Sequence, residues 1–335
     1  MIPVVVVTGF LGSGKTTLIG QVLRDPAFAR TAVIVNEFGE IGLDHELIAS
    51  ADETLMALTT GCLCCAVQSD LVRTLLDLQT RARAGEIPGY DRVLIETSGL
   101  ADPAPILQSL ITDSRLAAGH HVQSVVTLVD AVHGEATLDR HVEARRQVIL
   151  ADRLVLTKTD VAGPATELRN RMATLNPGAE LLTAIAGHLP PQELFAPAEA
   201  GAHADRLAGL PATGPSPFAR GTHSDAVESF LLERDTPMPG LALILLLEAL
   251  AEHCGPRLLR VKGLVRLEEM PDRPALIHGV QHVFAAPEFL TRWPSEDHRT
   301  RIVFIAQGVP RHFPARLLAA IEDEVREENA ARAPG

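Results

Sequence analysis

The stretch that decides the fold is residues 2–17, which read IPVVVVTGFLGSGKTT. The apolar, β-branched run Ile2–Thr8 predicts a buried strand, and the next residues complete the pattern G-x-x-x-x-G-K-[ST] where a helix, Lys15–Leu23, is expected. Between a strand and a helix, this pattern lets backbone amides and the helix N-terminus surround phosphate groups. The sequence therefore predicts a phosphate-binding loop formed by Gly9, Gly12, Ser13, Gly14, Lys15, Thr16 and Thr17.

The side chains of this loop predict nucleotide chemistry with Mg²⁺. Lys15 is expected to reach the β- and γ-phosphates, and the Thr16 hydroxyl to hold Mg²⁺. The motif Glu96-Thr97-Ser98-Gly99 comes at the end of another expected strand, Arg92–Glu96. Glu96 is therefore a candidate catalytic residue and Mg²⁺ ligand, often through water, and the Gly99 backbone is expected to meet the γ-phosphate.

A second motif indicates which base the site prefers. Thr157-Lys158-Thr159-Asp160 directly follows the expected strand Arg153–Leu156. The Asp160 carboxylate is suited to accept both hydrogen bonds from the N1 and exocyclic amino groups of guanine, whereas adenine leaves it unpaired, which is costly. The stem of Lys158 is expected to lie along the base. This set, Thr157, Lys158 and Asp160, predicts GTP as the nucleotide.

The segment after the second expected strand, Ala32–Asn36, suggests a switch loop. It reads Asn36-Glu37-Phe38-Gly39-Glu40, and Glu37 is a candidate for orienting water or binding a metal. Because the strands of a parallel sheet end at the same edge, the loop after Asn36 is expected to lie beside the phosphates.

Three cysteines predict a metal site. Cys62, Cys64 and Cys65 lie within four residues, between an expected strand, Thr54–Leu58, and the helix Asp70–Ala84. Cysteines so close together rarely form disulfides with one another. Three thiolates suit Zn²⁺, and Cu(I) is chemically possible. The fourth ligand is left open among water, Glu37, a distant residue and a partner protein.

The remaining pattern predicts an α/β domain with a mostly parallel sheet, followed by a smaller α+β domain. Apolar runs alternate with amphipathic stretches over the first 160 residues, and the first domain is expected to span residues 1–196. Residues 197–222, rich in Ala, Pro and Gly, are expected to form a linker, and residues 223–330 the second domain. Further strands are expected at Ser124–Asp130, Glu180–Leu182, Val227–Glu233, Leu258–Leu267, Ala275–His282 and Arg301–Gln307. Further helices are expected at Pro103–Ser109, Arg140–Leu150, Ala165–Leu175, Leu241–Cys254 and from Pro314 to about Glu327.

Composition narrows the class of protein. The chain has 335 residues, 46% of them hydrophobic, and a net charge of −12, which argues against a nucleic-acid or anionic-membrane surface. No apolar run approaches the roughly 18 residues of a membrane span, and Ile2–Val7 lacks the basic flank of a signal peptide. A cytoplasmic protein is expected. Only three of its thirty basic residues are lysine, and two of these, Lys15 and Lys158, lie in the motifs above.

With these motifs in place, the chain closely resembles the CobW-type family of P-loop GTPases, the cobalamin-synthesis-W and nitrile-hydratase-activator group. The residues that carry the resemblance are Thr8–Thr17, Asn36–Glu40, Gly61–Cys65, Glu96–Pro103 and Thr157–Asp160, with Arg260–Gly263 and Gly279–Gln281 in the second domain. The resemblance implies a GTPase that acts as a metallochaperone, usually for zinc, and a C-terminal domain that meets a client metalloprotein. Homo-oligomer formation is left open.

Two departures from the family pattern affect this interpretation. Thr157 stands where asparagine is more usual, which predicts softer selectivity for guanine. The linker lacks the His-rich run of many relatives, so metal binding depends on the cysteines.

Two other functions remain open at this point. A small-molecule or nucleotide kinase would also use the phosphate-binding loop, although Thr157–Asp160 argues against it. A nucleotide-gated interaction module would hydrolyse GTP slowly and bind no zinc.

Overall fold

The structure, a computed structural model, describes residues 1–36, 66–196 and 227–332. They belong to two compact units, Met1–Ala198 and Glu199–Gly335, and each unit has its own hydrophobic core. None of the helices in the described ranges is long and apolar enough to cross a membrane. Glu37, the expected strand Thr54–Leu58 and the three clustered cysteines lie outside the described residues.

The first unit contains a six-stranded parallel sheet with the strand order β2-β3-β1-β4-β5-β6. The strands have the bounds β1 Ile2–Gly9, β2 Thr31–Asn36, β3 Arg92–Thr97, β4 His120–Asp130, β5 Arg153–Thr157 and β6 Glu180–Thr183. Because every pairing is parallel, all six strands end at one edge of the sheet. That edge carries the residues that the sequence motifs single out.

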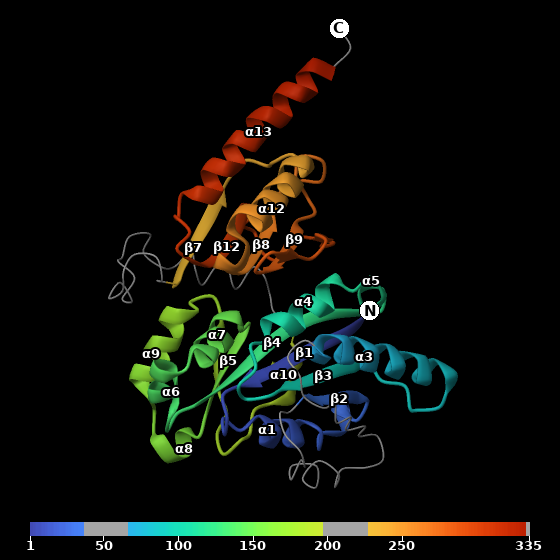
Figure 1. Ribbon diagram of the computed structural model, residues 1–335, viewed down its shortest axis with the longest axis vertical. Coiled ribbons are helices and arrows are strands. Elements are labelled where there is room, and N and C mark those ends of the chain that lie inside the picture. Colours follow the sequence, from blue (N-terminus) through green and yellow to red (C-terminus); the bar gives the residue numbers. More distant parts are fainter. Residues whose placement is uncertain (37–65, 197–226, 333–335) are drawn as a thin grey trace. The chain divides into compact units, whose positions relative to one another are not determined.

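Helices cover both faces of this sheet (Figure 1). Their bounds are α1 Lys15–Val22, α3 Ala66–Ala84, α4 Ala104–Thr112, α5 Ser114–Ala117, α6 Gly134–Arg140, α7 Val142–Leu150, α8 Thr159–Ala162, α9 Thr166–Leu175 and α10 Pro191–Phe195, with one 3-10 turn, Pro26–Phe28. The residues of β1 explain why both faces need cover. Val4, Val5, Val6 and Val7 alternate between the two faces, and each is at most 1% exposed.

One helix predicted from the sequence begins two residues later in the structure. The helix predicted over Arg140–Leu150 is present as α7, from Val142 to Leu150, and Arg140 is instead the last residue of α6, which the sequence analysis did not predict. Between them His141 has an extended backbone, with φ −116° and ψ 119°. Its ring packs against Phe10, with ring centroids 4.4 Å apart. A tertiary contact with the phosphate-binding loop therefore accompanies the break.

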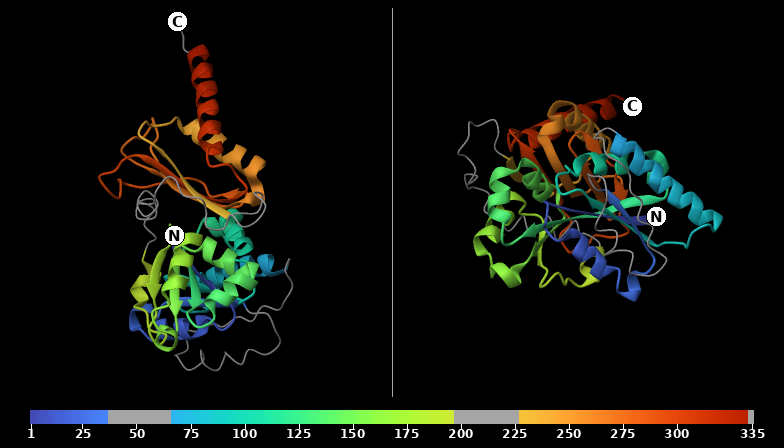
Figure 2. Two further views of the ribbon diagram at one scale, coloured as in Figure 1. Left: turned by 90° about the vertical axis from the view of Figure 1, so that its left-hand side faces the viewer. Right: turned by 60° about the horizontal axis from the view of Figure 1, so that its bottom comes forward.

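The second unit is an antiparallel sheet with the strand order β10-β9-β8-β12-β7, with two helices packed on it. The bounds are β7 Val227–Arg234, α12 Gly240–Cys254, β8 Leu258–Val265, β9 Ala275–Val280, β10 Val283–Phe284, β11 Glu288–Phe289, β12 Thr300–Gln307 and α13 Phe313–Arg332. Figure 2 shows α12 and α13 beside this sheet. Apolar side chains of β7, β8, β9 and β12 form one core with both helices. The predicted fold class, a parallel α/β domain plus a smaller α+β domain, is confirmed.

The strand predicted over Ala275–His282 ends early. β9 stops at Val280, and Gln281 and His282 form a two-residue turn into β10. Gln281 has a positive φ of 56°, which the turn requires and a strand does not allow.

Candidate nucleotide-binding site

The phosphate-binding loop leaves β1 and enters α1 with a backbone that depends on glycine. Gly12 and Gly14 have φ values of 71° and 93°, which side chains with a Cβ rarely adopt. At Gly9 a Cβ would lie 2.4 Å from the Leu128 carbonyl oxygen of β4, so the strand has no room for one. The loop therefore lies directly against the central strands, with its backbone amides available to an anion at the start of α1.

Lys15 is the first residue of α1, and its ammonium group is inside the loop. Nζ donates hydrogen bonds to the carbonyl oxygens of Gly9, at 3.0 Å, and Phe10, at 3.3 Å. Lys15 is only 8% exposed. A buried ammonium group at the start of a helix provides a concentrated positive charge for phosphate oxygens.

Two oxygen ligands lie next to this charge. The Thr16 hydroxyl donates to Glu96 Oε1 at 2.8 Å, although the two residues are 80 positions apart. Glu96 is near the end of β3, which pairs with β1, and it is 4% exposed. A hydroxyl and a carboxylate are hard oxygen donors, the type that Mg²⁺ prefers. These residues therefore fit a Mg²⁺ ion beside the phosphate-binding loop.

The loop after β3 packs closely against the phosphate-binding loop. A Cβ at Gly99 would lie 2.7 Å from the backbone nitrogen of Leu11. The turn is closed by the Ala101 amide, which donates to the Ser98 carbonyl at 3.0 Å. The contact explains why residue 99 is a glycine. It also places the Gly99 backbone beside the phosphate-binding loop, where the sequence analysis expects it to meet the γ-phosphate.

The third motif lies at the ends of β4 and β5. The Thr157 hydroxyl donates to the Ser13 carbonyl at 2.8 Å and approaches the Val129 carbonyl at 3.3 Å. Lys158 has a left-handed backbone with φ 58°, and its ammonium lies 2.7 Å from Asp130 Oδ2. Thr157 thus braces the phosphate-binding loop, and the ion pair fixes the direction of the Lys158 side chain.

Asp160 is exposed in the first turn of α8, opposite the loop that follows β6. Its Oδ1 accepts a weak hydrogen bond from the Ala186 amide at 3.4 Å. Ala186 has a positive φ of 48°, and the loop is held to β5 by the Ala184 amide, which donates to the Leu156 carbonyl at 2.9 Å. A carboxylate and a backbone amide are thereby brought to one place at the carboxyl edge of the sheet.

Comparison with known proteins agrees with this geometry. Residues 3–183 match the family described as "CobW/HypB/UreG, nucleotide-binding domain". Residues 227–323 match "Cobalamin synthesis protein cobW C-terminal domain". The chain belongs to the CobW family. The resemblance identified from the motifs is confirmed.

Two CobW-family relatives match this chain over nearly its whole length. The zinc chaperone YjiA of Escherichia coli is 34% identical over 310 residues, which cover 92% of this chain and 95% of YjiA. The zinc chaperone CobW of Pseudomonas aeruginosa is 33% identical over 97% of this chain and 91% of its own. Among solved structures, zinc-bound YjiA GTPase from E. coli superimposes with a TM-score of 0.68 at 28% identity, covering 96% of this chain and 98% of that one.

Within this CobW-family chain, the fold unites most of the residues predicted from sequence. Those of the phosphate-binding loop, Glu96, Gly99 and the motif from Thr157 to Asp160 all lie at one edge of one sheet. The zinc prediction, on Glu37, Cys62, Cys64 and Cys65, falls outside the described residues and stays a prediction. In the described ranges, no group of three or more His, Cys, Asp or Glu side chains is arranged to hold a metal ion.

Sequence reasoning missed two residues of this CobW-family site. Asp130 ends β4 at the same edge as Glu96 and pairs with Lys158, and its position at the end of an apolar strand was a usable signal. Ala186 contributes a backbone amide, for which its side chain gives no signal.

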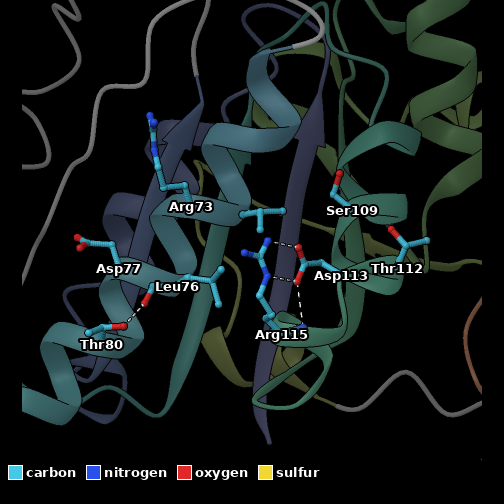
Figure 3. Close-up of a pocket in the computed structure, with 9 residues that line it drawn as sticks. Arg73, Leu76, Asp77, Thr80, Ser109, Thr112, Asp113 and Arg115 are labelled. Atoms are coloured by element: carbon cyan, nitrogen blue, oxygen red, sulfur yellow. Dashed lines mark hydrogen bonds and ion pairs between the residues drawn. The ribbon is translucent and has the colours of Figure 1, made fainter.

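The first unit also has a groove that contains none of the predicted site residues. It is a groove of about 840 Å³ between α3 and the α4–α5 region (Figure 3). On its α5 side Asp113 accepts hydrogen bonds from the Arg115 guanidinium at 2.7 and 3.1 Å, and this contact lowers the pKa of the Asp113 carboxyl. Its carboxylate also caps the start of α5, so these charges are explained by the local structure.

Proposed function

We propose that this CobW-family chain is a Mg²⁺-dependent GTPase that binds Zn²⁺ through Cys62, Cys64 and Cys65 and delivers it to a client metalloprotein. Relatives at 33–34% identity over most of the chain are named zinc chaperones, which supports the proposal. A yeast relative, 30% identical over 58% of this chain, is named a zinc-regulated GTPase metalloprotein activator. In this proposal the C-terminal domain contacts the client protein, and the oligomeric state is left open.

The observation that carries the GTPase half of the proposal is the contact between Thr16 and Glu96. A hydroxyl and a carboxylate 2.8 Å apart, beside the Lys15 ammonium, form the pair of oxygen donors that a nucleotide-bound Mg²⁺ needs. When bound there, Mg²⁺ supplies positive charge to the β- and γ-phosphate oxygens. Lys15 stabilises the same oxygens, and the Gly99 backbone is placed to contact the γ-phosphate. Glu37 is proposed to orient water or to bind metal.

Base choice rests on Asp160 in this proposal. Its carboxylate accepts hydrogen bonds from guanine N1 and the exocyclic amine, while the loop amide of Ala186 lies within 3.4 Å of the same carboxylate. Lys158, held by Asp130, presents its stem to the base.

The base assignment is tested by exchanging the acceptor for an amide. Asp160→Asn is expected to weaken GTP binding about 100-fold and to favour xanthosine triphosphate, because the amide donates where guanine also donates. Nucleotide affinities measured with fluorescent analogues report both effects. Lys15→Ala serves as a control that loses all nucleotides, and an Asp160→Asn protein with unchanged base preference contradicts the assignment.

The zinc half is tested by competition with a chromogenic chelator. The expected result is one Zn²⁺ per chain, with an affinity that differs among the GTP–Mg²⁺, GDP–Mg²⁺ and nucleotide-free protein. The triple Cys→Ser variant at 62, 64 and 65 should lose this stoichiometric binding and retain GTP binding. Cys254→Ala is the matched control, because Cys254 is buried in α12 and its thiol pKa is raised by burial.

Two outcomes contradict the zinc proposal in different ways. Stoichiometric zinc binding by the triple variant would show that the assigned ligands are wrong. Zinc affinity that is identical in all three nucleotide states would indicate a static site and favour a nucleotide-gated interaction module.

A further inference from the structure

One buried side chain of α7 binds the loop that follows β3. Gln147 is 1% exposed, and its Nε2 donates to the Gly99 carbonyl at 3.2 Å and to the Ala101 carbonyl at 3.0 Å. The two residues that it holds lie on either side of Leu100. A single amide thus fixes the middle of the loop that runs from the Mg²⁺-binding end of β3 to α4.

The helix that carries Gln147 is itself held in place. The Thr127 hydroxyl of β4 donates to the Gln147 carbonyl at 2.8 Å. At the end of α7, the two N–H bonds of the buried Asn176 amide are shared among the carbonyls of Val148, Ile149 and Ala151, with nitrogen–oxygen distances of 2.8–3.0 Å. These contacts make α7 a fixed support rather than a helix that can follow the loop.

The same helix also holds the far end of the loop. Arg146 lies beside Gln147 in sequence, and its guanidinium contacts Asp102 Oδ2 at 2.8 Å. The other oxygen of Asp102 accepts from the Ala104 amide at 3.0 Å, at the start of α4. The loop is therefore attached to α7 at residues 99, 101 and 102.

The opposite side of the loop contacts the phosphate-binding loop. Gly99 packs against the backbone of Leu11, so closely that a Cβ would overlap it. Residue 99 is thus fixed between the phosphate-binding loop on one side and the Gln147 amide on the other. Any change in the Gln147 hydrogen bonds must alter how the Gly99 backbone faces a bound nucleotide.

We propose that Gln147 is a positioning residue for GTP hydrolysis: it holds the Gly99 loop in the arrangement that contacts the γ-phosphate. This inference rests on the proposed GTPase function and adds a residue that does not touch the nucleotide. Glutamine suits the role, because its NH₂ group has two hydrogens for two carbonyls. A glutamate at this position would place acceptors against acceptors.

The test is to remove the amide and keep the side-chain volume. Gln147→Met is expected to bind GDP within about threefold of the wild type, because GDP lacks the phosphate that Gly99 meets. Its preference for a non-hydrolysable GTP analogue over GDP and its kcat should each fall about tenfold, the effect of losing two hydrogen bonds of ordinary strength. Calorimetry and single-turnover hydrolysis measure these quantities.

A matched control separates positioning from general loosening. Gln123 also donates its amide to a backbone carbonyl, that of Phe195. It lies near the start of β4, whereas the candidate site lies at the other end of that strand. Gln123→Met should leave the preference for the GTP analogue unchanged. A merely structural role for Gln147 would weaken GDP and the analogue equally.

The outcomes distinguish this inference from the proposed function. A wild-type protein that binds no guanine nucleotide contradicts both. A wild-type protein that prefers the analogue, together with a folded Gln147→Met that prefers it equally, contradicts the positioning role alone. If Gln147→Met does not fold, Gln147→Asn carries the test, because its amide is one methylene too short to reach both carbonyls.

Discussion

Thr157 shows how a single residue acquires a role that its motif does not state. Its side chain is 4% exposed and donates to the carbonyl of Ser13 in the phosphate-binding loop. From the sequence alone, threonine at this position predicted softer selectivity for guanine. The hydrogen bond instead favours a role in bracing the loop, which serves every nucleotide alike.

Replacing this hydroxyl by a methyl group distinguishes the two roles. Thr157→Val should lower the free energy of unfolding by about 1–3 kcal/mol, because the Ser13 carbonyl loses a buried donor. GTP and ATP should weaken by the same factor, so that their affinity ratio is unchanged. Urea denaturation and nucleotide titration measure both quantities, with the exposed Thr174→Val as control. A changed ratio would assign Thr157 to base recognition.

His120 makes a residue-scale prediction about pH. It is 3% exposed at the start of β4, and burial, the largest cause, lowers its pKa. The Leu116 backbone opposes this shift to a smaller extent, while Arg83, His121 and the N-terminal amino group add to it. The unfolded chain therefore binds a proton below about pH 6.5 that the folded chain excludes. Stability that is present above this pH is lost as the pH falls.

The expected slope is at most about 1.4 kcal/mol per pH unit for one such group. Urea denaturation at pH 7.5 and 5.5 should show a larger loss of stability for the wild type than for His120→Leu. His282→Leu, in the exposed turn after β9, should keep the wild-type loss. Equal losses in the wild type and His120→Leu would show that His120 titrates normally.

At the scale of elements, α7 shows how one residue outside a helix fixes it. Asn176 follows α9, is fully buried, and shares its two amide N–H bonds among three carbonyls at the end of α7. Helix ends leave such carbonyls without partners within the helix. Asn176→Ala should therefore lower the free energy of unfolding by at least about 2 kcal/mol. Asn170→Ala, on the exposed side of α9, should change it by less than about 0.5 kcal/mol in the same urea titration; similar losses would contradict the cap.

The elements also show where sequence patterns succeed. The central strands of the first sheet were predictable because apolar runs such as Val4–Val7 are buried on both faces. The short helices α5, α6, α8 and α10 have four to seven residues, too few for a clear apolar periodicity. The break at His141 is accompanied by a ring contact with Phe10, more than 130 positions away, which no local pattern can show.

At the scale of the whole molecule, the separate cores of the two units predict separate unfolding. Calorimetry should resolve two transitions. Nucleotide with Mg²⁺ at 100 times its dissociation constant should stabilise only the first unit, by about 2.7 kcal/mol, because only the folded site binds it. Lys15→Ala should remove this shift. A single transition, or two that move together, would show that the units unfold cooperatively.

Part of the candidate site could be predicted from the sequence, and part could be identified only in the structure. Its phosphate-binding loop, Glu96, Gly99 and Asp160 were identifiable because each belongs to a short motif at the end of an expected strand. The roles of Asp130, Ala186 and Gln147 depend on partners 28, 26 and 46 or more positions away. A local sequence pattern does not predict hydrogen bonds between residues so far apart.

The sequence by itself determined the family, the parallel α/β domain with a smaller α+β domain, and the chemistry expected at the phosphates. The family followed from the resemblance of the motifs to known proteins, and the fold class from the periodicity of the apolar residues. The phosphate chemistry followed from local backbone requirements, such as glycine at positions 12 and 14. Only the tertiary structure decided that Thr16 meets Glu96, that Thr157 braces Ser13, and that α7 holds the Gly99 loop. The physical reason is that a hydrogen bond between distant residues forms only when the sheet order and the helix packing bring its donor and acceptor within about 3 Å.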